Sequence, residues 1–141
     1  GHFIYINDTA LRFISDGTHE ATRTEYRPRL EVLEPDTWHT FSMRFRSDRG
    51  LDVQNSVNIS LEKETFLQSI GKYSVQSFRF KTKSSNEQVV LRFYQRNPLV
   101  ANGVTDIDWV KIEKGRVATD WTPAPEDNYT QEEFSIFVEP S

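Results

Sequence analysis

The stretch WHTFSMRFRS, residues 38–47, indicates the fold more clearly than any other part of the chain. His39, Phe41, Met43 and Phe45 occupy every second position, and threonine, serine and arginine fill the places between them. Successive side chains of a β-strand point to opposite faces. The alternation therefore predicts a strand with one face in a hydrophobic core and the other in solvent.

Similar segments recur along the chain between short runs rich in Gly, Ser, Asn and Pro. We expect strands near residues 3–6, 10–14, 29–33, 38–47, 52–61, 65–70, 73–82, 88–96 and 106–113. The separating turns are expected at SDRG (47–50), SIGK (69–72), KSSNE (83–87) and NPLVANG (97–103). Residues 15–28 are expected to form one long polar connection. Many short strands at this spacing predict an all-β sandwich or barrel.

The composition narrows the range of functions. The chain has 141 residues, the size of one ordinary domain, and its 10 Phe, 5 Tyr and 3 Trp suit sheets better than helices. It has no Cys, which excludes thiol catalysis and zinc–thiolate sites. The formal charge of -4 gives no overall attraction to nucleic acid. Apolar runs such as residues 3–6 are too short to cross a bilayer, so we expect no membrane insertion.

The charged residues show no pattern typical of an enzyme. The three histidines are scattered, and the chain has no glycine-rich nucleotide-binding motif. The pairs Asp106/Asp108 and Glu62/Glu64 have a two-residue spacing that leaves a structural calcium ion open as an alternative. The same pairs are poor candidates for glycoside hydrolysis, because neighbouring positions on one strand face do not oppose each other across a cleft. We therefore expect no catalytic activity and no cofactor other than that calcium ion.

The C-terminal third carries the most specific pattern. In DIDWVKIEKGRVATDWTPAPED (106–127) a hydrophobic strand ends in Lys-Ile-Glu-Lys-Gly and is followed by Ala-Thr-Asp-Trp-Thr-Pro-Ala-Pro. This stretch resembles the closing signature of jelly-roll, carbohydrate-binding-module-like domains of phage tail and baseplate proteins. Within that family it is most similar to accessory or receptor-recognition baseplate subunits from phages of Gram-positive bacteria. EPDTWHTFSMRFRS (34–47) and GKYSVQSFRFKT (71–82) resemble earlier strands of the family, so the similarity covers roughly residues 10–127.

The resemblance implies a fold, a function and a location. We expect a jelly-roll β-sandwich of two antiparallel sheets over residues 1–127, with residues 128–141 as a C-terminal extension or linker. The expected function is non-catalytic adhesion to host cell-envelope polysaccharide by a virion protein that also contacts other tail or baseplate subunits. The alternative is a structural module of the same fold without a glycan ligand.

The implied strand order also predicts a binding face. It places residues 29–33, 88–96, 52–61 and 65–70 side by side, so that their outward side chains share one surface, which is concave in related modules. Polar side chains there suit sugar hydroxyl groups, and arginines suit the acidic groups of many bacterial polysaccharides. The candidate ligand-binding residues are Arg29, Glu31, Gln54, Asn58, Arg92, Tyr94 and Arg96, together with Tyr26 beside the long connection.

Aromatic side chains complete the expected site. Tyr94 is the main platform for the apolar side of a sugar ring, and Phe66 is a further candidate. Trp38, Trp109 and Trp121 lie away from the predicted face, and we interpret them as structural residues. A solvated sheet face without any ligand would have the same polar character, so that interpretation stays open for each residue.

The segment FSIFV (134–138) leaves the pattern of the preceding domain. Its composition is typical of a strand, and a free apolar strand of this kind promotes aggregation. We expect it either to add an edge strand to its own sheet or to that of a neighbouring subunit, or to begin a connection to the next module. In each case we expect Phe134, Ile136 and Phe137 to be at least partly covered.

Overall fold

The computed structural model describes residues 2–5, 11–28, 33–54, 57–85, 87–118 and 134–140, and in 2–5 and 134–140 it describes the main chain only. The described residues contain antiparallel strands and no helix, which confirms the all-β prediction. The strands are β1 (His2–Tyr5), β2 (Leu11–Ile14), β3 (His19–Tyr26), β4 (Trp38–Gln54), β5 (Ile59–Leu61), β6 (Thr65–Thr82), β7 (Leu91–Gln95), β8 (Val104–Lys114) and β9 (Phe134–Pro140).

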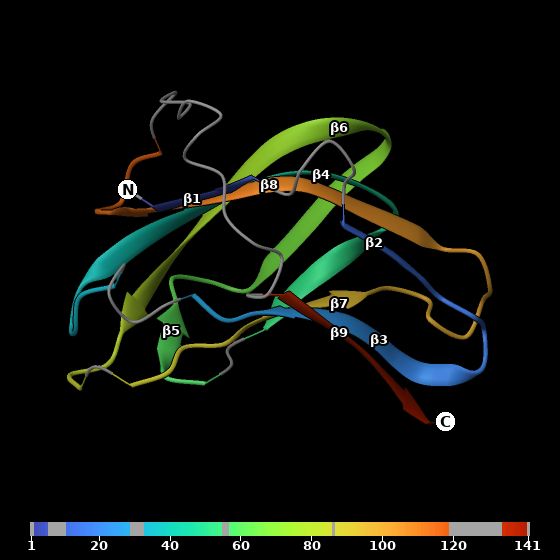
Figure 1. Cartoon of the computed structure of the whole chain (residues 1–141), viewed down its shortest axis with the longest axis horizontal. Coiled ribbons are helices and arrows are strands. Elements are labelled where there is room, and N and C mark those ends of the chain that lie inside the picture. The colour runs from blue at the N-terminus through green and yellow to red at the C-terminus, as the bar shows by residue number, and fades with distance from the viewer. Residues whose placement is uncertain are drawn as a thin grey trace.

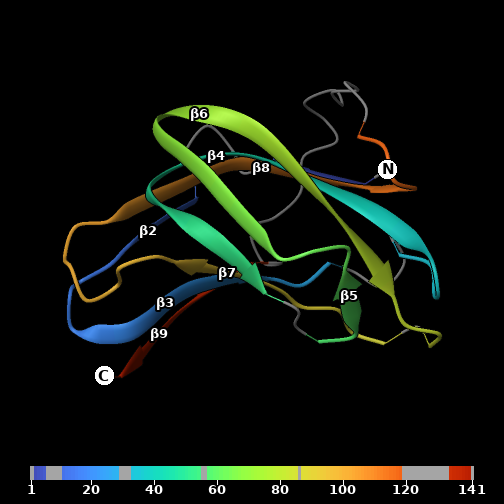
Figure 2. The same ribbon diagram turned by 180° about the vertical axis from the view of Figure 1, so that it is seen from behind.

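The strands form two facing layers, as Figures 1 and 2 show from opposite sides. One layer contains β1, β2 and β8 with the first half of β4 and the second half of β6. The other contains β7, β3 and β9 with the end of β4 and the start of β6. This arrangement is sandwich-like, and the jelly-roll strand order stays a prediction.

The strands β4 and β6 belong to both layers because each bends back at one end of the molecule (Figure 1). The register between them shifts between Phe45 and Ser47 and again between Ser47 and Leu51. Near these shifts lie two glycines with positive φ, Gly50 at 77° and Gly71 at 78°, a conformation that glycine adopts without steric cost. The predicted turns at SDRG and SIGK are therefore bends within two long strands, not breaks between four shorter ones.

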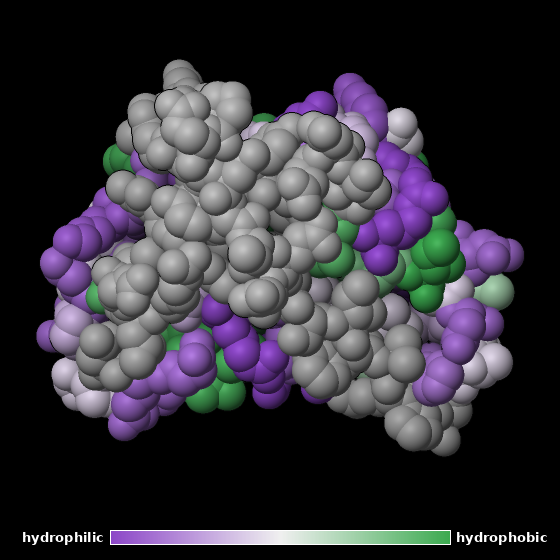
Figure 3. Space-filling model, viewed as in Figure 1, coloured by the Kyte–Doolittle hydropathy of each residue, from purple (hydrophilic) through white to green (hydrophobic). Residues whose placement is uncertain are grey.

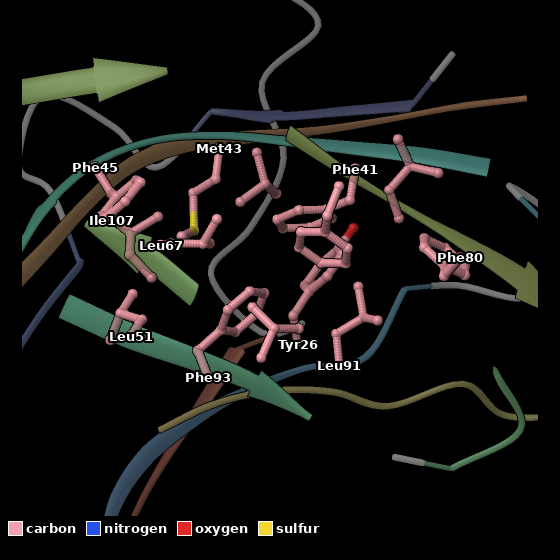
Figure 4. Packing of buried hydrophobic residues seen from close by; sticks show 14 of the residues in the cluster. Tyr26, Phe41, Met43, Phe45, Leu51, Leu67, Phe80, Leu91, Phe93 and Ile107 are labelled. Carbon is pink, nitrogen blue, oxygen red and sulfur yellow. The ribbon is translucent and has the colours of Figure 1, made fainter. Parts of the chain in front are cut away.

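The hydrophobic core lies between the two layers, and Figure 4 shows its side chains pointing inward from both. The four alternating residues of the stretch 38–47 are all 0% exposed, which confirms that this face is buried. The ring of Phe41 lies at the centre of an aromatic group, 5.0 Å from the ring of Phe78 and 5.5 Å from that of Phe93. Rings at these separations stabilise the core beyond the burial of their area.

The outer face of the first half of β4 differs from the prediction. Thr40 and Ser42 were expected in solvent, yet they are 0% and 2% exposed. Their hydroxyls are satisfied, since Thr40 donates to the carbonyl oxygen of Gly115 at 2.8 Å and the Ser42 hydroxyl lies 2.8 Å from that of Ser77. Small hydroxyl side chains that find partners can be buried at little cost, so alternation alone overestimated the exposure here.

The prediction that residues 15–28 form one long connection was wrong over most of that range. Its central part forms β3, which pairs with β7 on one side and with β9 on the other. Thr22 and Thr24 are both 0% exposed, so polar residues occupy buried positions of this strand. The predicted strand at 29–33 falls mainly outside the described residues.

The segment FSIFV lies within β9, which pairs antiparallel with β3 and so extends this chain's own sheet. This confirms the first of the two pairings expected for it. The exposure of its side chains and the boundary predicted at residue 127 lie outside the described residues.

Hydrophilic side chains form much of the described surface in Figure 3, with small apolar patches between them. The described residues include no helix of the length and apolar character that crossing a bilayer requires.

Candidate ligand-binding groove

The strand β7 carries two of the predicted site residues, Arg92 and Tyr94, and its alternate residues are buried. The end of β4 lies beside it, so that Gln54 is opposite Arg92 and Asp52 is opposite Tyr94. Arg96 follows the end of β7 and hydrogen-bonds to Asp52. The end of β4 pairs with β7 on one side and with the start of β6 on the other, as predicted. This arrangement brings together four predicted residues, Gln54, Arg92, Tyr94 and Arg96.

Arg92 belongs to a cluster of three arginines around one buried carboxylate. The side chain of Glu25 is 1% exposed and accepts hydrogen bonds from Arg23 at 2.9 Å, Arg27 at 2.6 Å and Arg92 at 2.9 Å. Burial by itself raises the pKa of Glu25, but the hydrogen bond from Arg23 and the charges of Arg27 and Arg92 outweigh it and hold that pKa below its ordinary value. Glu25 is thus ionised and lies at the centre of this cluster, and the guanidinium of Arg92 is already paired with it.

The ring of Tyr94 is half-buried, and the Arg23 guanidinium carbon lies 5.6 Å from its centroid. This distance is typical of a cation–π contact. Tyr94 is therefore engaged with β3 on at least one side, which limits its use as a flat platform for a sugar.

Arg96, Asp52 and Phe66 form a second cluster on the same face. Arg96 donates to both carboxylate oxygens of Asp52 at 2.9 Å, in the paired geometry that suits a guanidinium and a carboxylate. The same guanidinium lies 3.6 Å above the centroid of the Phe66 ring. Phe66 remains 39% exposed, so this cluster presents an aromatic surface to solvent.

A groove of about 810 Å³ opens beside this cluster, where β4 ends and β6 begins. Its volume falls within the range of small-molecule sites in proteins. The lining residues are Asp52, Val53, Gln54, Leu61, Lys63, Glu64, Thr65, Phe66 and Arg96. The groove therefore contains two predicted residues, Gln54 and Arg96, and the predicted aromatic candidate Phe66.

Three polar side chains of the groove differ from the arginines of the same face. Gln54, Lys63 and Glu64 are exposed, and none of them has a side-chain hydrogen bond or ion pair with another described residue. An amide, an ammonium group and a carboxylate together offer several donors and acceptors. These groups are able to bind a ligand without first breaking a contact within the described part of the chain.

Other predicted site residues lie elsewhere. Tyr26 is 0% exposed and its ring packs 5.8 Å from that of Phe41, so its assignment as a ligand platform was wrong. Its alternation on β3 turns it toward the core, which could not be seen while residues 15–28 were interpreted as a connection. Asn58 sits in a turn with φ of 62° and donates to the main-chain oxygen of Gln88 at 2.7 Å, which places it outside the expected strand row. Arg29 and Glu31 lie outside the described residues.

Sequence reasoning missed Asp52 and Lys63 as lining residues of this groove, and it considered Glu64 only as a metal ligand or as a carboxylate for hydrolysis. The alternation that predicted Gln54 as outward also places Asp52 on that face, two residues earlier. The charged run EKE (62–64) between two predicted strands is the second signal, since loop residues at the end of a sheet commonly line binding sites.

Of the four carboxylates considered for calcium, three have protein partners, and Glu62 is one of them through Arg116. Asp106 pairs with Arg12 at 2.7 Å and with Arg46 at 2.9 Å, and Asp108 pairs with Arg44. Within the described part of the chain, no three His, Asp or Glu side chains come together in a way that could hold a metal ion.

Two of the three tryptophans fall within the described residues, where they are half-buried and outside the groove. The Arg116 guanidinium carbon lies 4.2 Å from the ring centroid of Trp38. These positions agree with the structural interpretation of Trp38 and Trp109.

Comparison of the sequence with protein-family models and with curated proteins gave no match.

Proposed function

We propose that the protein is a non-catalytic carbohydrate-binding module that holds a cell-surface polysaccharide in the groove between the end of β4 and the start of β6. The observation that carries the proposal is the combination found there. A partly exposed aromatic ring, Phe66, borders a groove whose polar side chains Gln54, Lys63 and Glu64 have no partner within the described structure.

This combination suits the chemistry of a sugar. A pyranose presents hydroxyl groups around its edge, which need both donors and acceptors, and an apolar C–H side, which packs on an aromatic ring. The groove is open to solvent, so we expect weak binding by one copy. Repeated copies on one particle would raise the overall affinity through effective concentration.

The charges in the groove balance, since Lys63 and Arg96 oppose Asp52 and Glu64. The expected fit of this face to acidic groups relied on Arg92 and Arg96 as free donors, and both bind carboxylates of the chain itself. We therefore propose that hydroxyl groups, and not an acidic group, carry recognition.

The phage tail or baseplate location rests on the sequence signature at residues 106–127. A tail protein that adheres to the host cell envelope needs this kind of non-catalytic site. Asp52 is poorly suited to acid catalysis, because both of its oxygens accept hydrogen bonds from Arg96. This supports a role in binding without hydrolysis.

A structural tail module of the same fold is the second candidate. It is favoured by the many arginines on both outer faces that already pair with carboxylates of the chain, among them Arg12, Arg44, Arg92 and Arg96. Such internal pairing stabilises a scaffold and leaves few groups for a ligand.

Multivalent display of the whole chain separates these candidates. Beads coated with the protein would be tested against wall polysaccharides purified from Gram-positive bacteria and against a neutral glycan array. We expect binding that falls at least tenfold in a Gln54→Ala, Lys63→Ala, Glu64→Ala triple variant. A Lys72→Ala, Glu87→Ala variant changes exposed charges outside the groove and should bind like the wild type. No binding by the wild type would refute the proposal, and equal loss in both variants would refute the groove assignment.

A further inference from the structure

A second hollow of about 390 Å³ lies beside the proposed sugar groove. It is bordered by residues 62–67 on one side and by residues 76–79 on the other, which are two parts of the chain brought together because β6 bends back on itself (Figure 2). Glu62, Ser77 and Arg79 are among its lining residues.

The two hollows share a border. Lys63, Glu64, Thr65 and Phe66 line both of them. Of these, Lys63 and Glu64 are exposed and have no side-chain partner among the described residues. The segment 63–66 is thus a polar ridge with a hollow on each side, and its side chains can contact a ligand in either one.

The second hollow offers hydrogen-bonding groups of its own. The edge of β6 away from β4 pairs, within the described residues, only with β5, through residues 80–82. Beyond that pairing, the main-chain N–H of Glu62 donates to the carbonyl oxygen of Arg79. The Nε of Arg79 donates to the carbonyl oxygen of Arg116 at 2.9 Å, which fixes the guanidinium in place. Its terminal N–H groups have no partner among the described residues and remain available to donate hydrogen bonds to a ligand oxygen.

Gln76 holds the shape of this hollow. Its side-chain amide donates to the carbonyl oxygen of Gln68 and accepts from the main-chain N–H of the same residue at 3.4 Å. This clamp ties two parts of β6 together and occupies the strand edge at Gln68. An extended peptide would need that edge for a continuous hydrogen-bond ladder, so the clamp favours a ligand that uses side-chain groups.

We propose that the site takes an oligosaccharide, not a single sugar, and that the chain of sugars crosses the ridge 63–66 from the groove into the second hollow. This inference rests on the proposed function and adds the length of the ligand to it. Arg79 and Gln76 form the second subsite, and the first subsite contains Gln54 and Phe66.

The test uses a ladder of fragments from the wall polysaccharide, from single sugars to hexasaccharides, with affinities measured by calorimetry on the whole chain. For the wild type we expect at least a tenfold gain in affinity between the single sugar and the longer fragments. In Arg79→Gln and in Gln76→Glu we expect most of this gain to disappear, while single-sugar affinity stays within about twofold of the wild type. Gln54→Ala should weaken single sugars and long fragments by the same factor.

Amide chemical shifts give a second measurement. Long fragments should shift the amide signals of residues 76–79 and single sugars should not. Equal affinity for short and long fragments, or equal losses in Arg79→Gln for both, would overturn the two-subsite inference and leave the groove itself intact. Absence of binding by every fragment would overturn the proposed function as well, and binding of extended peptides along this edge in place of sugars would do the same.

Discussion

The buried carboxylate of Glu25 provides the sharpest test of how this sheet is held together. The substitution Glu25→Gln keeps the size and shape of the side chain but removes its charge. Three guanidinium groups then lie close together without the anion that they surround, and their mutual repulsion is no longer offset.

The expected cost follows from burial. Removing one partner of a buried ionic group costs about 3–5 kcal/mol, because the remaining charges stay in a poorly solvated place. The partner arginines are 13% to 40% exposed, so water relieves part of this cost. We therefore expect a loss of roughly 2–3 kcal/mol in the free energy of unfolding, which lowers the melting temperature of a domain of this size by roughly 6–12 °C.

Urea titrations at several pH values measure this effect. The pKa of Glu25 is lowered in the folded protein, so its ionised form contributes stability above the ordinary value of 4.5, and that stability is lost as the pH falls through the folded pKa. The difference between the wild type and Glu25→Gln should be largest near neutral pH and shrink in acid. Asp52→Asn is the matched control, since the side chains of Asp52 and Arg96 are 37% and 48% exposed and solvent screens such a pair, so its loss should change stability little.

The reasoning would be refuted if Glu25→Gln destabilised the protein no more than Asp52→Asn at neutral pH. It would also fail if the loss in Glu25→Gln were independent of pH down to strongly acidic conditions, because the effect would then come from packing and not from charge.

Three further predictions concern the bends, a buried imidazole and the core. An alanine Cβ at position 50 would lie 2.5 Å from two ring atoms of Phe66, so Gly50→Ala should weaken saccharide binding on beads. Gly71 has a similar positive φ with open space around it, so Gly71→Ala should lower the free energy of unfolding by only about 1–2 kcal/mol and leave binding unchanged. Burial lowers the pKa of His39 below 6.5, so the free energy of unfolding should fall as the pH drops below that value, and urea titrations of His39→Phe should lack this slope. Phe41→Ala should reduce the free energy of unfolding by about 3–5 kcal/mol in the same titrations, since the Phe41 ring is fully buried.

The fold could be predicted from the sequence where hydrophobic alternation is strong and local. The buried face of residues 38–47 is the clearest case, because each of its four inward residues is large and either apolar or aromatic. The prediction failed at β3, whose core-facing positions include Thr22 and Thr24 and whose outward Glu25 is buried by arginines. Hydropathy cannot identify a strand whose burial depends on hydrogen bonds and ion pairs made with distant parts of the chain.

The bends of β4 and β6 show a second limit of local reasoning. The glycines at the two bends are a correct signal for a change of direction, and the same signal is produced by a turn between separate strands. Only the pairing of both strands with each other on either side of the bend distinguishes the two cases. That pairing depends on the whole topology, which no short segment contains.

The candidate groove shows the most general reason why sequence prediction was incomplete. Alternation correctly placed Arg92 and Arg96 outside the core, and residue type then suggested that their guanidinium groups bind a ligand. Their actual partners are Glu25, which is 67 residues from Arg92 in the chain, and Asp52, which is 44 residues from Arg96. An arginine that faces outward is available to a ligand only if no carboxylate of the fold reaches it first, and this depends on which strands become neighbours. The groove residues that stay without such a partner, Lys63 among them, belong to the end of one strand and the connection after β5. Polar residues at strand ends that have no carboxylate or arginine opposite them on a neighbouring strand are therefore better candidates for ligand contacts than arginines at the centre of a sheet.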